Sequence, residues 1–133
     1  MYSNIQFPLP YKSHSIWLLL FICQFSLNAQ TKVNVREPVY NFGKITPGPA
    51  YFHTFYIINE GTKPLVIQDV KGSCSCTQPE WTRHPVAPGD SAEVRIAYLS
   101  KGKKGDFWKS IRVNANIEEN PLKLYLKGTC IEN

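Results

Sequence analysis

Two cysteines one residue apart, in the segment Ser73–Thr77 (SCSCT), have the types and spacing to do chemistry in this chain of 133 residues. Neighbouring positions on an extended backbone point to opposite faces, so Cys74 and Cys76 would present their sulfur atoms side by side. Such a pair can bind a soft metal, form a tight local disulfide, or bridge separately to other cysteines. Both side chains can also be small buried hydrophobic groups, as free cysteines often are.

The N-terminal segment bears on the compartment in which these cysteines work. Residues 16–27 (IWLLLFICQFSL) form an apolar run of the length of a signal-peptide core, too short to span a bilayer comfortably. Lys12 precedes the run, and Ala29 follows it as a small residue before a cleavage point. We therefore predict that residues 1–29 are a secretory signal cut after Ala29, which makes the protein exported, periplasmic or extracellular, with no membrane span after cleavage. An uncleaved anchor is the alternative.

Export also changes the cysteine count. Removal of Cys23 leaves Cys74, Cys76 and Cys130. In an oxidising compartment an odd number leaves at least one thiol unpaired within the chain. That thiol would be free, bound to a metal, or joined to another molecule.

The elements that must position these residues are strands. After residue 30 the apolar positions recur every second residue, and the segments are separated by turns rich in Gly and Pro. This pattern predicts one domain over residues 30–133, all-β, an immunoglobulin-like sandwich of two antiparallel sheets with about seven strands. The predicted strands are 39–45, 51–59, 65–70, a short edge strand in 76–81 that contains Pro79, 91–99, 108–117 and 122–128.

The same alternation predicts the core and the placement of the cysteines. If the short strand in 76–81 exists, the third and seventh strands run in the same direction, which puts Cys74 and Cys130 at the same end of the sandwich. We expect them to be near each other without a required bond. The predicted core side chains are Phe42, Phe55, Ile57, Leu65, Ile67, Val94, Ile96, Ile111, Val113, Leu124 and Leu126.

Six short motifs follow one another along the chain: Tyr40–Ile45, His53–Gly61, Lys63–Ile67, Ser73–Thr77, Ala87–Asp90 and Lys127-Gly128. In combination they resemble a family of bacterial secreted proteins, the domain-of-unknown-function family 1573. The resemblance covers residues 38–129 and implies an immunoglobulin-like sandwich, related to the major sperm protein and to ciliary and spindle-associated modules. It implies no established activity. The family usually has Gly between the two cysteines, where this chain has Ser75.

Few residues offer catalytic chemistry. Beyond the signal segment the histidines are His53, within a strand, and His84, in a loop flanked by proline. The sequence has no HExxH, no phosphate loop and no zinc-type CxxC pair, so we predict that the protein is not an enzyme and has no cofactor. The basic residues are spread out and give a mild net charge of +5, so nucleic acid is not an expected partner.

Two functions fit these residues. The first is an exported, non-catalytic binding or assembly module of the cell envelope, whose partner is an envelope or extracellular protein. Trp81 and Trp108 are its candidate interface residues, with packing in the core or its rim as the alternative. The second is a thiol or soft-metal module that binds copper or zinc through Cys74, Cys76 and His84.

Overall fold

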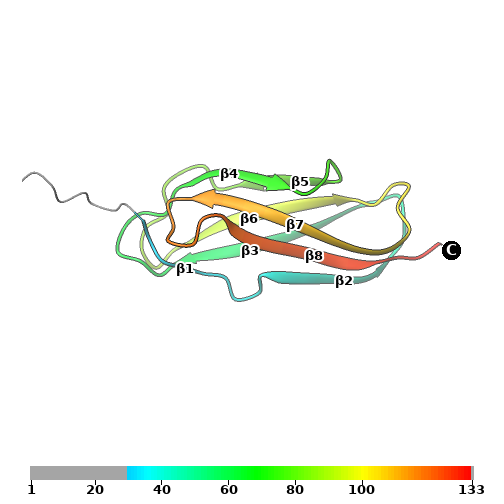
Figure 1. Cartoon of the computed structure of the whole chain (residues 1–133), viewed down its shortest axis with the longest axis horizontal. Helices are drawn as coiled ribbons and strands as arrows, with labels where there is room; N and C mark the ends of the chain where they lie inside the picture. The colour runs from blue at the N-terminus through cyan, green and yellow to red at the C-terminus, as the bar shows by residue number, and fades with distance from the viewer. Residues whose placement is uncertain (1–29, 133) are drawn as a thin grey trace, which may run out of the picture.

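The computed structural model describes residues 30–132, and the predicted signal peptide, residues 1–29, lies outside them. The described chain folds into two packed layers of strands (Figure 1). The strands are β1 (Val33–Asn34), β2 (Val39–Ile45), β3 (Ala50–Asn59), β4 (Ile67–Gly72), β5 (Thr77–Trp81), β6 (Ser91–Leu99), β7 (Gly105–Ala115) and β8 (Leu122–Cys130).

The two layers are four-stranded sheets, as the sequence predicts for a sandwich. One sheet has the order β1-β3-β6-β5 and is antiparallel throughout, and the other has the order β2-β8-β7-β4. The second sheet differs from the prediction in one pair, because β2 runs parallel to β8. The chain leaves the first sheet after β1 and joins the second at Pro38, whose carbonyl accepts a hydrogen bond from the Tyr125 N–H at 2.8 Å. The chain therefore places β2 on the side of β8 opposite β7. Because no hairpin connects β2 to β8, the two strands need not run in opposite directions, and they pair in parallel.

Alternation of apolar and polar residues places the core between the sheets. In β6 the inward positions Val94 and Ile96 are fully buried, while Glu93 and Arg95 face solvent. Ten of the eleven predicted core residues are buried. The exception is Phe42, which is only partly buried because β2 is the outermost strand of its sheet. The predicted core is otherwise confirmed.

Several predicted strand boundaries shift by one to three residues. The strand expected at 65–70 is β4 at Ile67–Gly72, and Leu65 instead forms an isolated bridge with Val86. The short strand expected in 76–81 is present as β5 at the edge of its sheet, where Pro79 breaks no essential ladder bond. Since β4 and β8 both pair antiparallel with β7, they run in the same direction, as the strand count predicts.

Asn59 fixes the turn that follows β3. Its side chain is fully buried and makes four hydrogen bonds. The amide donates to the Lys63 and Val86 carbonyls at 2.7 and 3.0 Å, and the Oδ1 atom accepts from the Thr31 hydroxyl and the Gly61 N–H, both at 3.0 Å. Asn residues commonly fix turns in this way, because the side chain bonds to nearby backbone groups.

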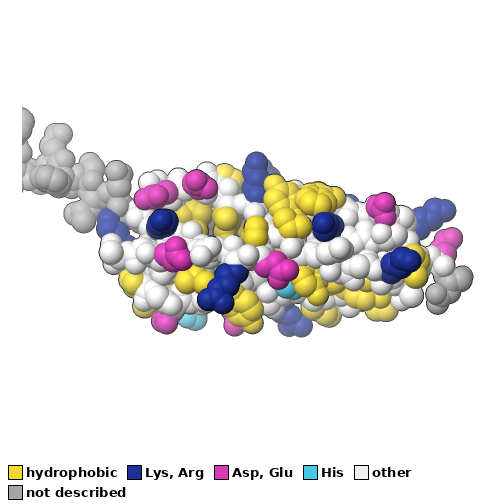
Figure 2. Space-filling model, turned by 90° about the horizontal axis from the view of Figure 1, so that it is seen from below, with side chains coloured by type: hydrophobic (Ala, Val, Ile, Leu, Met, Phe, Trp, Pro, Cys, Tyr) yellow, Lys and Arg dark blue, Asp and Glu magenta, His cyan; other side chains and the backbone are white. Residues whose placement is uncertain are grey.

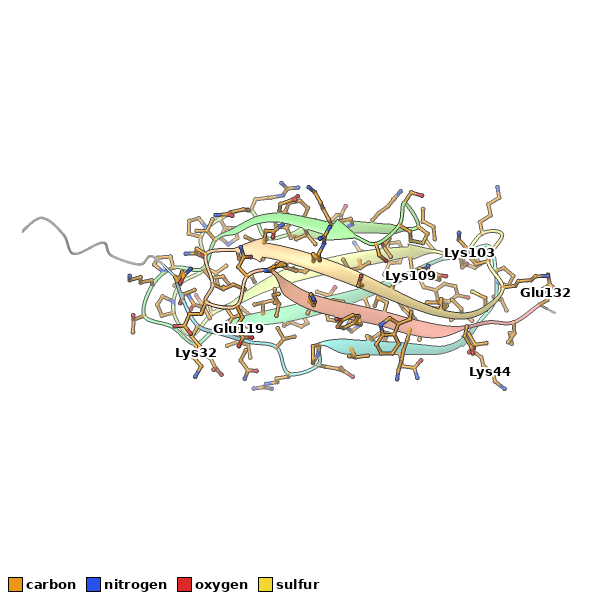
Figure 3. All side chains as sticks on the ribbon, in the orientation of Figure 1. Lys32, Lys44, Lys103, Lys109, Glu119 and Glu132 are labelled. Atoms are coloured by element: carbon orange, nitrogen blue, oxygen red, sulfur yellow. A yellow bond between two sulfur atoms is a disulfide. The ribbon has the colours of Figure 1, made fainter. Side chains whose placement is uncertain are left out.

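Charged side chains lie at the two ends of the sandwich as well as on the outer faces. In Figure 3, Lys44, Lys103 and Glu132 lie at the end where β8 finishes, and Lys32 and Glu119 lie at the opposite end. All five of these side chains are exposed to solvent.

Candidate functional site

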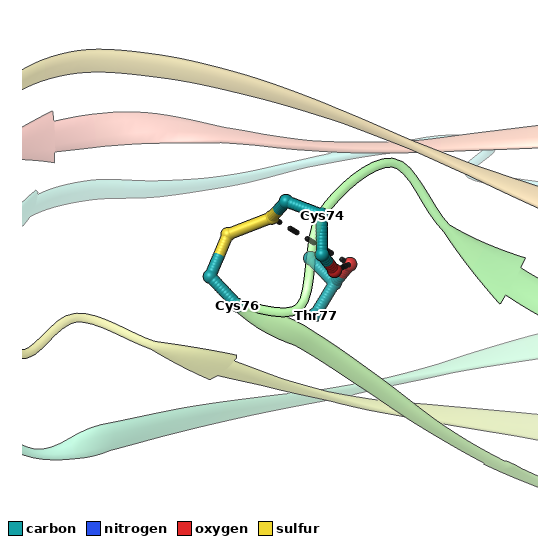
Figure 4. The surroundings of a disulfide bond; sticks show 3 residues. All are labelled: Cys74, Cys76 and Thr77. Atoms are coloured by element: carbon teal, nitrogen blue, oxygen red, sulfur yellow. Dashed lines mark hydrogen bonds between the residues drawn. A yellow bond between two sulfur atoms is a disulfide. The ribbon is translucent and has the colours of Figure 1, made fainter.

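The Cys74–Cys76 pair is a disulfide on the turn between β4 and β5 (Figure 4). The two Cα atoms are 5.2 Å apart. The Cys74 carbonyl accepts hydrogen bonds from both the Thr77 N–H at 3.1 Å and the Thr77 hydroxyl at 2.9 Å. These bonds close a tight turn around the bridge. Of the alternatives that the sequence leaves open, the structure therefore has the local disulfide.

This turn joins the two sheets. The Ser73 N–H donates to the Ser110 carbonyl of β7 at 2.9 Å, and the Leu99 N–H of β6 donates to the Cys76 carbonyl at 2.8 Å. Each sheet therefore holds one end of the turn. Cys76 is buried and Cys74 is half-buried, and both pack against the core.

Cys130 is the free cysteine among the described residues and is buried. It ends β8 beside Gly105, at the end of the sandwich where the β6–β7 turn lies. The carbonyl of Cys76 bonds to Leu99 at the same end, so the structure agrees with the predicted placement of the SCSCT cysteines and Cys130. The disulfide, however, joins Cys74 to Cys76 and does not include Cys130.

Tyr98 is the polar neighbour of Cys130 that the sequence did not single out. Its ring is buried and stacks on Phe107, with ring centroids 4.2 Å apart. The pKa of Tyr98 is raised to about 12. Burial of the hydroxyl is the largest cause, and the neighbouring Cys130, including its hydrogen bond to the hydroxyl, adds to it. The inward position of Tyr98 follows from strand alternation, but its pairing with Cys130 depends on the other sheet.

The structure does not bring His84 to the two sulfur atoms. Thr77 at the start of β5 pairs with Tyr98, whereas Trp81 at its end pairs with Val94. His84 follows Trp81 and so lies beyond the opposite end of β5 from Cys76. Within residues 30–132 no group of three or more His, Cys, Asp or Glu side chains could hold a metal ion. The arrangement thus supports disulfide chemistry at this turn rather than the predicted metal set.

The two candidate interface tryptophans differ in their surroundings. Trp81 is half-buried and packs against the core, with the Arg83 guanidinium 3.6 Å from its ring centroid. Its indole N–H is buried without a hydrogen-bond partner. Trp81 therefore matches the packing alternative.

Trp108 instead projects from the outer face of the β2-β8-β7-β4 sheet and is 56% exposed. Its ring lies 5.5 Å from that of Tyr125, and the Lys127 ammonium is 5.5 Å from the indole centroid. A hollow of about 440 Å³ adjoins it, lined also by Asn41, Asp106, Phe107, Gly128 and Thr129. Trp108 thus offers an accessible aromatic anchor beside polar and charged groups.

Two exposed aromatic residues of β3 were not among the predicted interface residues. Phe52 and Tyr56 are 54% and 55% exposed on the outer face of the other sheet. Their neighbour His53 points inward and stacks on Tyr40 of β2, with ring centroids 3.7 Å apart. Burial lowers the pKa of His53, and Glu37 partly opposes that shift. The alternation of β3 was a usable signal, because it puts Phe52 and Tyr56 on the face opposite the core.

Two layers of this topology define a protein of the immunoglobulin-like, PapD-like sandwich class. The chain belongs to the family described as "Protein of unknown function (DUF1573)", whose pattern matches residues 33–130. No curated protein matches the sequence. Membership confirms the resemblance seen in the motifs.

Solved structures share the fold at low sequence identity. The ASH / PapD-like domain 7 of human CEP192 is 17% identical, with a TM-score of 0.65, and the match covers 79% of this chain and 89% of that one. A protein of unknown function from Porphyromonas gingivalis W83 is 19% identical with a TM-score of 0.66, covering 77% of this chain and 48% of that one.

A third similar structure, the secreted serine protease VesC from Vibrio cholerae, is 14% identical with a TM-score of 0.59, and the match covers 79% of this chain but 24% of the protease. At these identities the likeness concerns the fold alone. Proteases and hydrolases occur among the similar structures beside PapD-like domains. In the part of the chain that the structure describes, no helix has the length and apolar character needed to cross a membrane.

Proposed function

We propose that this protein is an exported, non-catalytic binding or assembly module of the cell envelope. The observation that carries the proposal is the exposure of Trp108 on the outer face of its sheet. An indole of this exposure keeps a large apolar area in water, and its burial by a partner would be favourable at about 25 cal/mol per Å². Tryptophan is also enriched among the residues that dominate binding energy at interfaces.

The neighbours of Trp108 fit a protein partner. Tyr125 widens the apolar surface, while Lys127 stands over the indole face as a cation–π partner. The hydroxyl of Thr129 donates a hydrogen bond to Asp106 at 2.6 Å, which holds a polar margin beside the hollow. An apolar centre with a polar margin is the usual anatomy of a protein interface.

Co-purification of the exported protein from the envelope, followed by mass spectrometry, tests this proposal. We expect Trp108→Ala to lose the captured envelope protein. The matched control is Arg112→Ala, which alters an exposed residue on the same face of the same strand. Capture that is equal for the wild type and Trp108→Ala, or lost equally in Arg112→Ala, would contradict a Trp108 interface.

Export is tested separately by the intact mass of the secreted product. A protein that begins at Gln30 is expected. A mass that still includes residues 1–29 would mean that the segment is retained as an anchor.

A further inference from the structure

Most of one side of β3 has no neighbouring strand. β1 pairs with β3 only at Asn59 and Ile58, after which the chain crosses to the other sheet. From residue 50 to residue 57, the strands described for residues 30–132 provide β3 with a partner on the β6 side alone.

Hydrogen bonds at the end of β3 identify the backbone groups that face this open side. The Asn59 N–H donates to the Asp90 carbonyl on the β6 side, and the Glu60 N–H donates to the Lys32 carbonyl on the β1 side. Because backbone groups alternate in direction along a strand, the odd-numbered residues of β3 bond to β6. The amides and carbonyls of Phe52, Thr54 and Tyr56 therefore point outward at the open edge.

The edge strands β2, β4 and β5 carry charged residues or backbone irregularities of their own, whereas β3 carries neither, and the charges beside its open side, Arg36 and Glu37, belong to the crossing segment. Pro79 and Glu80 lie on β5, and Asp69 and Lys71 lie on β4. β2 has a bulge in its pairing with β8 between Asn41 and Lys44. Proteins use such features to prevent strands from pairing between molecules. The ten residues of β3, AYFHTFYIIN, contain no Pro, Gly, Asp, Glu, Lys or Arg.

We propose that β3 pairs with β3 of a second copy of this chain, antiparallel, about a twofold axis at Thr54. This register sets Thr54 opposite Thr54 and places Phe52 of each copy opposite Tyr56 of the other. All three residues present their free backbone groups to the partner strand, and the two exposed aromatic side chains meet on one face as a favourable cross-strand pair. The β1-β3-β6-β5 sheets of the two copies then join into one continuous sheet.

The spacing of the aromatic residues favours a second copy over an unrelated strand. Phe52 and Tyr56 lie at equal distances on either side of Thr54, so a twofold axis there makes the edge complementary to itself. A hollow of about 440 Å³ lies between the crossing segment Val35–Glu37 and residues 53–58 of β3, and it gives room for the partner's side chains. Figure 2, which views the molecule from below, shows hydrophobic side chains among charged ones on that side.

The expected dimer is weak, because one strand edge buries less than the roughly 1,200–2,000 Å² of a typical stable interface. Sedimentation equilibrium of the exported protein, up to about 1 mM, should show a reversible monomer–dimer equilibrium. Thr54→Lys and Thr54→Glu should each weaken the dimer at least about tenfold, because like charges would meet on the axis. An equimolar mixture of the two variants should dimerise again.

The control variant is Gln78→Lys, which adds the same charge at an exposed position on β5 and should leave the dimer unchanged. Amide hydrogen exchange on the wild type gives a measurement that does not depend on the variants. The amides of Phe52, Thr54 and Tyr56 should be protected in concentrated solution and exchange faster on dilution.

A protein that stays monomeric over the whole range, or a dimer indifferent to both Thr54 variants, would overturn the proposal. Slow exchange at these three amides that does not change with concentration would overturn it as well. Trp108 lies on the outer face of the other sheet, so failure here leaves the proposed envelope partner to its own test.

Discussion

Reduction of the Cys74–Cys76 disulfide should cost little stability. The bridge spans a sequence separation of 2, so the ring it closes in the unfolded chain is very short. Loop-closure entropy for such a ring of about three residues corresponds to about 1.6 kcal/mol at 25 °C. In the folded state the turn keeps its bonds from Thr77 to the Cys74 carbonyl and its ties to both sheets.

A bridge from Cys74 to Cys130 would behave differently, because it would close most of the domain and contribute about 4 kcal/mol by the same relation. Urea unfolding followed by tryptophan fluorescence, with and without reductant, separates the two cases. We expect a loss of at most about 1.6 kcal/mol in the free energy of unfolding. The double variant Cys74→Ala/Cys76→Ala should show no response to reductant.

A loss near 4 kcal/mol on reduction would refute this reasoning, since a three-residue ring cannot supply it through chain entropy. A response to reductant in the double variant of the exported protein would show instead that Cys130 is bonded to another molecule. Peptide mapping of the non-reduced protein identifies the bonded pair directly.

Three further predictions concern polar side chains that are buried or half-buried in the sandwich. Because the pKa of Tyr98 is raised from 10.0 to about 12 in the folded protein, the free energy of unfolding should fall as the pH rises across that interval, and Tyr98→Phe should flatten the decline in a series of urea titrations. Because burial lowers the pKa of His53 from 6.5, stability should be lost as the pH falls below that value, and His53→Gln should reduce the slope of thermal stability against pH. Asn59→Ala removes four buried hydrogen bonds and should cost about 3 kcal/mol or more in chemical denaturation, against less than about 0.5 kcal/mol for Gln78→Ala on the surface. The pKa assignments would be contradicted if the difference in stability between the wild type and Tyr98→Phe, or His53→Gln, did not change with pH. The role of Asn59 would be contradicted if Asn59→Ala were as stable as Gln78→Ala.

Local patterns in the sequence were sufficient to assign most of the strands and most of the core. Alternation is a local property of an extended backbone, so Ser91–Leu99 could be read as a strand with its buried face assigned before any partner was known. The turn role of Asn59 could be read in the same way, because Asn-Glu-Gly is local chemistry. The succession of short motifs was sufficient to indicate the family.

Features that depend on contacts between distant segments could be assigned only from the folded chain. The sequence places three cysteines near one another but does not contain their pairing, which follows from the turn that joins β4 to β5. Trp81 and Trp108 were equivalent candidates in sequence, yet only Trp108 stands on an outer face. β2 joins β8 in parallel, and β3 keeps an open edge, because the chain changes sheets after β1. Pairing between strands far apart in sequence is not encoded in the period of either strand, so only the folded chain determines which edges and side chains remain free to bind.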